Sequence, residues 1–247
     1  MVPSAMTAQG EIIVISPHLD DAVLDCSDHI LAWKEHGLPV RVVTVFTKLL
    51  TPSPEGGSHE SPADLERIRM REDRKAMGLL GVSSECLGFA DWAFRHKGKS
   101  PDRIDQAKQN ALSDPILGTL KTVIMSFRNR GLFVVPLGIG RHVDHVLVRE
   151  AAEVAIEPTE LCYYVDYPYA LSIINWTGRH VLKVIGAKKS IRIMSKKKKQ
   201  LLETYRSQIP QIFSHTRFSM PWITWAVVKS YPEIVLYHRR TRLRPRK

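Results

Sequence analysis

A short run of β-branched residues near the start of the chain, followed by a helical stretch and a second such run, constrains the fold most strongly. The runs are Glu11–Ser16 (EIIVIS) and residues 40–47 (VRVVTVFT), and residues 22–36 between them have the pattern of a helix. Two strands joined by a helix at this spacing form a parallel βαβ unit. The chain is therefore expected to contain a mostly parallel sheet.

Further strands and helices are expected along the rest of the chain. A third strong strand is expected over residues 132–137 (LFVVPL), with helices over residues 63–80 and 145–156. Weaker strand patterns lie at residues 85–89, 161–165 and 233–239, and weaker helical patterns at residues 102–130 and 195–208. A chain of 247 residues suits one α/β domain with a buried core. We predict an α/β, Rossmann-like fold with helices flanking the sheet, in a single domain over residues 1–247.

The predicted domain has two parts that differ in charge. Residues 11–170 form its core, and residues 171–247 form a smaller, basic C-terminal extension packed on that core. Residues 179–247 contain 18 Lys/Arg and 2 Asp/Glu, a net charge of +16, whereas residues 1–178 sum to −5. This asymmetry suggests an anionic partner for the C-terminal part.

The lysine run at residues 196–199 leaves three interpretations open. It could be the solvated start of a helix, a surface for anionic membrane lipid or nucleic acid, or a region that receives an anionic substrate. No zinc finger or RNP motif accompanies the charge, so sequence-specific nucleic-acid binding has little support. A non-catalytic module that binds nucleic acid or anionic membrane is the alternative to an enzyme.

Cysteine content and hydropathy bear on the compartment of the protein. Cys26, Cys86 and Cys162 are an odd number without a CxxC pair, so neither a disulfide framework nor a cysteine-ligated zinc site is expected. The apolar runs are far shorter than the about 20 residues that span a bilayer, and residues 1–10 do not resemble a secretory signal. A cytoplasmic protein with no transmembrane segment is expected.

Two groups of histidine and aspartate follow strands of the predicted sheet. PHLDD at residues 17–21 comes directly after the first strand, and RHVDH at residues 141–145 follows the third strong strand. In open α/β sheets, ligands bind beyond the carboxyl ends of the strands. His18, Asp21 and one histidine of the second group would supply two imidazoles and a carboxylate. That set suits a catalytic Zn²⁺ with an open position for water, and it also suits Fe²⁺.

Plainer interpretations of the same residues exist. Asp20 and Asp21 could cap a helix, and the second group could be the polar start of another helix. Either explanation is reasonable for one group alone, but two groups in order, each after a strand, favour a metal site. Arg69 could pair with acidic residues along its helix, and Asp91 could be a turn residue.

Other segments accompany the two groups. The chain has a charged helix with Arg69, Glu72 and a Leu-Gly end, the segment LGFAD at residues 87–91, and PLGIGRH at residues 136–142. Together with PHLDD and HVDH, these segments resemble the PIG-L/LmbE-like zinc-dependent N-deacetylases through much of residues 11–170. The resemblance implies a hydrolase that uses metal-activated water. Its substrate would be a small molecule or glycoconjugate that carries an N-acetylated amino sugar of the GlcNAc type, from which it would remove the acetyl group.

The resemblance also implies a role for each site residue. The zinc ligands would be His18, Asp21 and His145. Asp20 would be the general base, and a protonated His142 would stabilise the oxyanion or protonate the leaving amine. Asp144 would orient and charge a catalytic histidine. The residues that contact the sugar would be Arg69 and Asp91.

The chain departs from the family pattern around the first group. Ala22 stands where many members have Glu, and Leu19 stands where many have Pro. Relatives with PHLDD often continue with Ser-Cys-Gly-Gly, whereas this chain has Asp-Cys-Ser-Asp at residues 25–28. Every implied ligand is retained, but the packing of the first helix and the substrate pocket are expected to differ, which leaves another amide or an ester open as the substrate.

Overall fold

The computed structural model describes residues 10–49, 61–96, 107–139, 142–168, 188–192, 195–208 and 233–237. Most of the basic extension lies outside these residues, including the end of the chain. An anionic partner for that region therefore stays a prediction, as does the single domain over residues 1–247.

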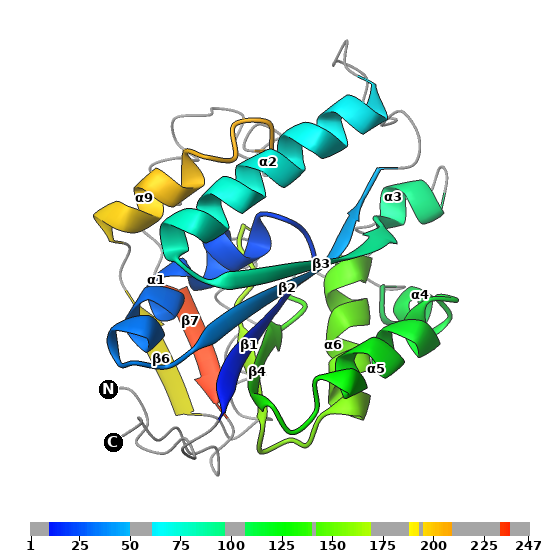
Figure 1. The fold of residues 1–247 in the computed structure, drawn as a ribbon. Coiled ribbons are helices and arrows are strands. Elements are labelled where there is room, and N and C mark those ends of the chain that lie inside the picture. The colour runs from blue at the N-terminus through cyan, green and yellow to red at the C-terminus, as the bar shows by residue number, and fades with distance from the viewer. Residues whose placement is uncertain are drawn as a thin grey trace.

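A central sheet organises the described residues (Figure 1). Its strands are β1 (Glu11–Ser16), β2 (Val40–Lys48), β3 (Ser83–Ala90), β4 (Gly131–Pro136), β5 (Leu161–Tyr164), β6 (Lys188–Arg192) and β7 (Glu233–Tyr237). They lie in the order β3-β2-β1-β4-β5-β7-β6. The first five pair in parallel, and β7 pairs antiparallel with both β5 and β6. The prediction of an α/β, Rossmann-like fold with a mostly parallel sheet is confirmed.

Helices cover both faces of this sheet (Figure 1). They are α1 (Asp21–Glu35), α2 (Pro62–Leu80), α3 (Trp92–Arg95), α4 (Ala107–Leu112), α5 (Leu117–Ser126), α6 (Val143–Ala155) and α9 (Lys196–Leu202). Helices α1, α2 and α9 pack on one face, and α4, α5 and α6 pack on the other. Among the described residues, no helix has the length and hydropathy needed to cross a membrane.

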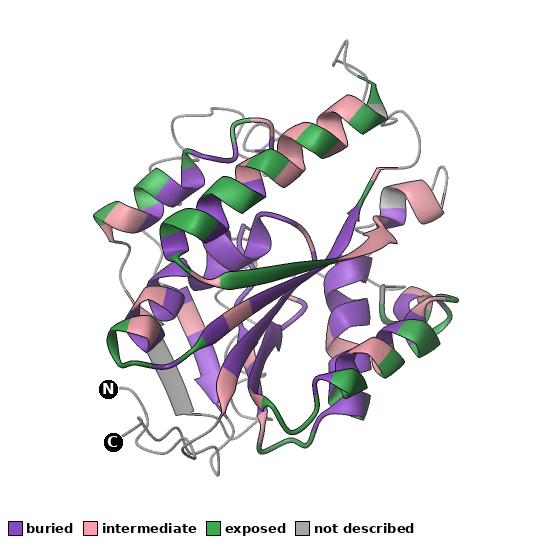
Figure 2. Ribbon diagram, in the orientation of Figure 1, coloured by how far each residue is buried: buried purple, intermediate pink, exposed green. Residues whose placement is uncertain are grey.

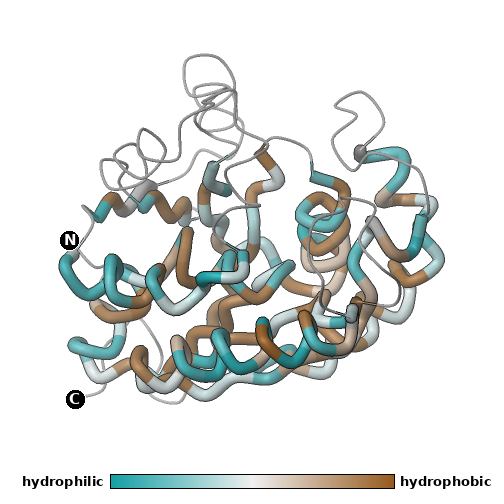
Figure 3. Tube along the Cα trace, turned by 90° about the horizontal axis from the view of Figure 1, so that it is seen from above, coloured by the Kyte–Doolittle hydropathy of each residue, from teal (hydrophilic) through white to brown (hydrophobic). Residues whose placement is uncertain are grey.

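Alternate side chains of β1 face two separate hydrophobic cores. Ile12 and Val14 pack with α1 and α2, whereas Ile13 and Ile15 pack with α5 and α6, and all four are fully buried. Figure 2 shows buried central strands beneath helices with exposed outer faces, and Figure 3 shows hydrophilic and hydrophobic residues alternating along the outer helices. A parallel sheet buried on both faces requires apolar strands, which explains the unbroken β-branched runs.

The ends of α2 follow from the residues that flank it. The Ser61 hydroxyl accepts a hydrogen bond from the N–H of Asp64, which caps the first turn. Gly81 follows the last turn with a φ of 65°, a left-handed conformation that glycine adopts without strain. The predicted stop of this helix at Gly81 is confirmed.

A buried ionic network ties the C-terminal strand and helix to α1. The carboxylate of Glu233 in β7 is fully buried and lies 2.7 Å from Nζ of Lys198 in α9. It also accepts hydrogen bonds from the backbone N–H groups of Asp28 and His29 and from the hydroxyl of Ser27, all in α1. The described part of the C-terminal extension is thus held against the helix that begins with a predicted metal ligand.

The lysine run is divided between the surface and the interior. Ser195 caps α9 by accepting a hydrogen bond from the N–H of Lys198. Lys196 and Lys199 are exposed, whereas the Lys198 side chain is buried against Glu233. A solvated helix start describes the two exposed lysines. It is wrong for Lys198, whose charge is neutralised inside the protein.

We expect Glu233→Gln to lower the free energy of unfolding by about 3–5 kcal/mol at neutral pH, because it leaves the buried Lys198 ammonium without its counter-ion. Burial alone would raise the pKa of Glu233, but Lys198 and His29 outweigh burial and hold this pKa at about 2, below the ordinary value of 4.5. The stabilisation is therefore present above about pH 4.5 and is lost as the pH falls towards about 2.

Urea unfolding at a series of pH values measures this effect. The matched control is Lys199→Gln in the same helix, which is expected to change the free energy of unfolding by less than about 0.5 kcal/mol because Lys199 is exposed. An equal loss in the two variants would contradict the assignment. So would a Glu233→Gln deficit that does not shrink between about pH 5 and about pH 3.

Candidate metal centre

The two predicted groups meet at one edge of the sheet because β1 and β4 are parallel neighbours. His18 lies in the loop after β1, Asp21 is the first residue of α1, and His145 lies in the first turn of α6. Since α1 and α6 pack on opposite faces, the chain reverses its winding direction between β1 and β4. Such a switch point is where open α/β sheets bind their ligands.

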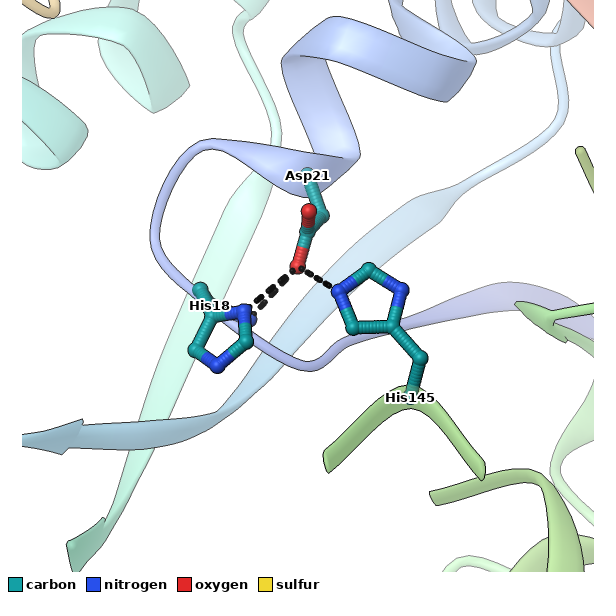
Figure 4. A group of neighbouring side chains, drawn as sticks. All are labelled: His18, Asp21 and His145. Carbon is teal, nitrogen blue, oxygen red and sulfur yellow. Dashed lines mark hydrogen bonds and ion pairs between the residues drawn. The ribbon is translucent and has the colours of Figure 1, made fainter. Parts of the chain in front are cut away.

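His18, Asp21 and His145 point their ligand atoms at one another (Figure 4). Oδ2 of Asp21 lies 3.2 Å from Nδ1 of His18 and 3.4 Å from Nε2 of His145. One ligand atom from each residue lies within 4.8 Å of the other two. Ligand atoms bonded to a tetrahedral zinc ion at about 2.0–2.2 Å are separated by about 3.4 Å, so these two distances fit such an ion.

Each of these histidines turns its second ring nitrogen to a buried carboxylate. Nε2 of His18 lies 3.2 Å from Oδ2 of Asp144, and Nδ1 of His145 lies 2.7 Å from Oδ1 of Asp166. Both aspartates are fully buried. Metal-ligating histidines are usually held in this way by a carboxylate or carbonyl. The donor set therefore fits a divalent ion in chemistry as well as in spacing.

Asp144 is itself held by residues that the sequence analysis did not select. Nη2 of Arg95 lies 2.7 Å from Oδ1 of Asp144, and the backbone N–H of Trp92 donates to Oδ2 at 2.9 Å. Arg95 also pairs with Asp114 at 2.9 Å. Together these contacts fix Asp144 against His18. The histidine that Asp144 contacts is therefore the predicted ligand His18.

Asp20 has the environment of a general base. Its side chain is buried, with 8% of the residue exposed, and it lies next to Asp21 outside the candidate ligand set. Burial and the charge of Asp21 raise the pKa of Asp20 to about 6. Asp20 occupies the N-cap position of α1, but its side chain makes no capping hydrogen bond. A purely structural role as a cap therefore does not account for this residue.

The ionisation of His142 differs from the expectation drawn from the sequence. Burial and the nearby charge of His18 lower the pKa of His142 to about 4, although the charge of Asp144 acts in the opposite direction. This direction opposes the protonated form that the sequence analysis expects for His142, and the catalytic role of the residue stays a prediction. A neutral imidazole still donates one hydrogen bond. The ring centroid of His142 lies 5.1 Å from that of His18 and 5.3 Å from that of His145.

The two candidate ligand histidines shift the other way. Burial would lower the pKa of His18, but its hydrogen bonds to Asp144 and Asp21 raise it well above the ordinary value. Burial would also lower the pKa of His145, but the charge of Asp21 and the hydrogen bond to Asp166 raise it. A histidine must give up the proton on the nitrogen that binds a metal, so an ion and protons compete for these side chains.

The two residues expected to contact a sugar also lie at this site. Oδ2 of Asp91 is 3.6 Å from Nε2 of His18, and a quarter of the Asp91 side chain is exposed. The positive charge of Arg69 lowers the pKa of Asp20, against the larger effect of burial, which places Arg69 near that carboxylate. Asp91 therefore lies at the metal centre and Arg69 is within electrostatic reach of Asp20, while the contact of either residue with a sugar stays a prediction.

A second candidate ligand group among the described residues, His18, His142 and Asp144, overlaps the first. It shares His18, and its carboxylate already accepts from Arg95 and from the N–H of Trp92. A carboxylate neutralised by a guanidinium is a poor ligand for a further cation. These contacts favour His18, Asp21 and His145 as the candidate ligand group.

The sequence analysis missed Asp166 and Arg95. Asp166 lies two residues beyond the end of β5, next to β4, so it obeys the same rule that selected the other groups. A search for acidic residues after every predicted strand would have found it. Arg95 lies in the short helix α3 and gives no comparable signal, because its two carboxylate partners are 19 and 49 residues away in sequence.

We expect the protein to bind one Zn²⁺, and Asp21→Ala to weaken that binding by more than about 100-fold, because Asp21 faces both histidines. The affinity of the unaltered protein should rise with pH, since the raised pKa values of His18 and His145 make protons competitors. Titration against a chelating indicator measures both effects. His36→Ala is the control, because His36 is exposed at the end of α1. Unchanged affinity in Asp21→Ala, or a similar loss in His36→Ala, would contradict the assignment.

Two curated relatives of this chain are named as deacetylases. The chain is 28% identical over 168 residues to a 2'-N-acetylparomamine deacetylase of Streptomyces fradiae, and 25% identical over 182 residues to one of Niallia circulans. These alignments cover 66% and 63% of this chain. They span 58% and 66% of the lengths of those two relatives.

Comparisons of structure and family agree with the fold and the motifs. A zinc-inhibited form of a teicoplanin deacetylase superposes with a TM-score of 0.63 at 21% identity, over 92% of this chain and 97% of that one, which bears on the fold. The family model for PIG-L, GlcNAc-PI de-N-acetylase, matches residues 13–156, a stretch that contains both groups of site residues. Because this match covers more than half of the chain, the protein belongs to the PIG-L/LmbE-like family.

Proposed function

We propose that this protein is a metal-dependent hydrolase that removes the acetyl group from an N-acetylated amino sugar of the GlcNAc type. The observation that carries the proposal is the convergence of His18, Asp21 and His145 beside Asp20, a buried carboxyl with a pKa of about 6. Family membership supports the reaction class. The relatives named as 2'-N-acetylparomamine deacetylases support an acetylated amino sugar as the substrate class.

Zn²⁺ is the ion that we propose for the centre, although Fe²⁺ takes the same kinds of ligand. His18, Asp21 and His145 would hold it and would leave one position of a tetrahedral site open. A bound Zn²⁺ supplies Lewis acidity, which can lower the pKa of water to about 7.

Asp20 would carry the proton through the reaction. A carboxyl with a pKa of about 6 is ionised at neutral pH and is basic enough to accept a proton from the attacking water. The same carboxyl would then deliver this proton to the amide nitrogen as the C–N bond breaks, so that acetate and a free amine leave. One residue would thus serve as base and then as acid.

His142 would stabilise the negative charge that develops on the carbonyl oxygen. Because its pKa is about 4, it would act as a neutral hydrogen-bond donor. A single donor of this type contributes roughly 10²–10³ in kcat. Arg69 and Asp91 would bind the sugar, since a guanidinium and a partly exposed carboxylate can both hydrogen-bond with hydroxyl groups.

We expect Asp20→Asn to reduce kcat by about 10²–10⁴ and to retain Zn²⁺, because the amide cannot accept a proton and Asp20 is outside the ligand set. Acetate release and metal content measure the two effects on the same preparation. The control is Asp64→Asn, a partly exposed aspartate in the first turn of α2 outside the site, which should match the unaltered enzyme. Full activity in Asp20→Asn would refute the assigned role.

An acetate-release screen over GlcNAc conjugates and N-acetylated aminoglycosides tests the reaction itself. At least one substrate should release acetate, a chelator should stop the release, and added Zn²⁺ should restore it. The alternative of a non-catalytic binding module has a different outcome. It predicts no bound metal and binding to nucleic acid or anionic vesicles that weakens steeply with salt.

A further inference from the structure

We propose that Asp166 is a positioning residue that fixes which nitrogen of His145 carries a proton, so that Nε2 is free to bind a metal. The inference rests on the proposed function, because it assigns His145 as a ligand. Oδ1 of Asp166 lies 2.7 Å from Nδ1 of His145, and Nε2 of the same ring lies 3.4 Å from the Asp21 carboxylate. A carboxylate only accepts hydrogen bonds, so Nδ1 must be the protonated nitrogen.

The Asp166 carboxylate is placed by two further contacts. Its other oxygen, Oδ2, accepts a hydrogen bond of 2.9 Å from the backbone N–H of Ile139, in the loop after β4. The next residue, Tyr167, donates its backbone N–H to Oδ1 of Asp25 in α1 at 2.9 Å. The segment after β5 is therefore tied to the strand end that precedes α6 and to α1, the helix of Asp21.

The burial of this carboxylate makes its hydrogen bonds specific. Asp166 is fully buried, and 1% of His145 is exposed, so water does not replace either partner readily. Hydrogen bonds to an ionised group in such surroundings are short and strong. Each oxygen of Asp166 accepts a hydrogen bond from a group that has to be a donor. The backbone N–H of Ile139 can only donate, and Nδ1 of His145 must carry the proton if Nε2 is to bind the metal.

This arrangement makes asparagine a diagnostic substitution. An asparagine offers one accepting oxygen and one donating NH₂ group, whereas the site requires two acceptors. If the oxygen faces His145, the NH₂ group meets the N–H of Ile139. If the NH₂ group faces His145, Nδ1 must accept, and the proton moves to Nε2, where it blocks the metal. A misplaced imidazole tautomer of this kind disables catalytic histidines in other proteins.

The test compares Asp166→Asn and Asp166→Glu with a matched control, Asp28→Asn. Asp28 is also a buried aspartate that accepts one backbone N–H and one side-chain donor, both from Ser195, and it touches none of the candidate ligands in the contacts described. Zn²⁺ affinity is measured by competition with a chelator, and circular dichroism confirms that each variant is folded. We expect Asp166→Asn to lose about 10–100-fold in Zn²⁺ affinity, Asp166→Glu to lose less, and Asp28→Asn to bind as the unaltered protein does.

A residue that only stabilises the fold would lower the melting temperature and leave the Zn²⁺ affinity of the folded variant unchanged. That result for Asp166→Asn would overturn the inference, and so would an equal loss of affinity in Asp28→Asn. A second measurement needs no variant. In ¹⁵N-histidine-labelled protein loaded with Zn²⁺, His145 should show a protonated Nδ1, and a protonated Nε2 would overturn the inference.

These outcomes separate the inference from the proposed function. If the protein binds Zn²⁺, loses affinity in Asp166→Asn and hydrolyses no acetylated sugar, the role of Asp166 stands and the proposed reaction fails. If it hydrolyses a substrate while Asp166→Asn keeps full Zn²⁺ affinity, the reaction stands and the role of Asp166 fails. If the unaltered protein binds no Zn²⁺, both are overturned.

Discussion

The burial of several carboxylates at the carboxyl ends of β1, β4 and β5 is the constraint on which the site depends. Asp20, Asp21, Asp144 and Asp166 are all 8% exposed or less. Burying an ionised carboxylate is unfavourable unless cations or hydrogen-bond donors replace water. Here the partners are two imidazoles, the Arg95 guanidinium and backbone N–H groups. Asp20 receives the least compensation, which is why its pKa rises while that of Asp21 falls to about 2. The contrast would separate the proposed proton carrier, Asp20, from the candidate metal ligand one residue away.

The departure from the family pattern at residues 25–28 has a structural explanation in this chain. Asp25 accepts the backbone N–H of Tyr167, Ser27 donates to Glu233, and Asp28 accepts the backbone N–H of Ser195. The glycines that relatives often have in place of Ser27 and Asp28 have no side chain with which to make these contacts. The bulkier, more acidic stretch of α1 therefore serves to attach the segment after β5, the helix α9 and the strand β7. This stretch of α1 is thereby attached to residues more than 140 positions away in sequence.

How much of this could be predicted depends on the kind of signal each residue gives. The β-branched runs of β1, β2 and β4 mark strands directly, and a histidine next to an aspartate after a strand marks a site, so the central sheet and all three candidate ligands were predictable. Asp166 obeys the same rule with a single acidic residue, which is too common a feature to stand out. Arg95 and Glu233 act through partners that only the folded chain brings close. The ionisation of His142 depends on burial and on the charge of His18, and neither quantity can be read from sequence.

Protons and a divalent ion are alternative ways of supplying positive charge to the same cluster. The raised pKa values of His18 and His145 mean that both imidazoles bind a second proton readily, and a divalent ion would replace those two protons with the same total charge. The outer N–H groups, which face Asp144 and Asp166, stay protonated in either case. Because these outer hydrogen bonds do not have to change, the rings are held with Nδ1 of His18 and Nε2 of His145 towards Asp21 whichever cation is bound. The second layer of carboxylates would thus preorganise the candidate site, because a bound ion would displace protons without requiring either ring to rotate.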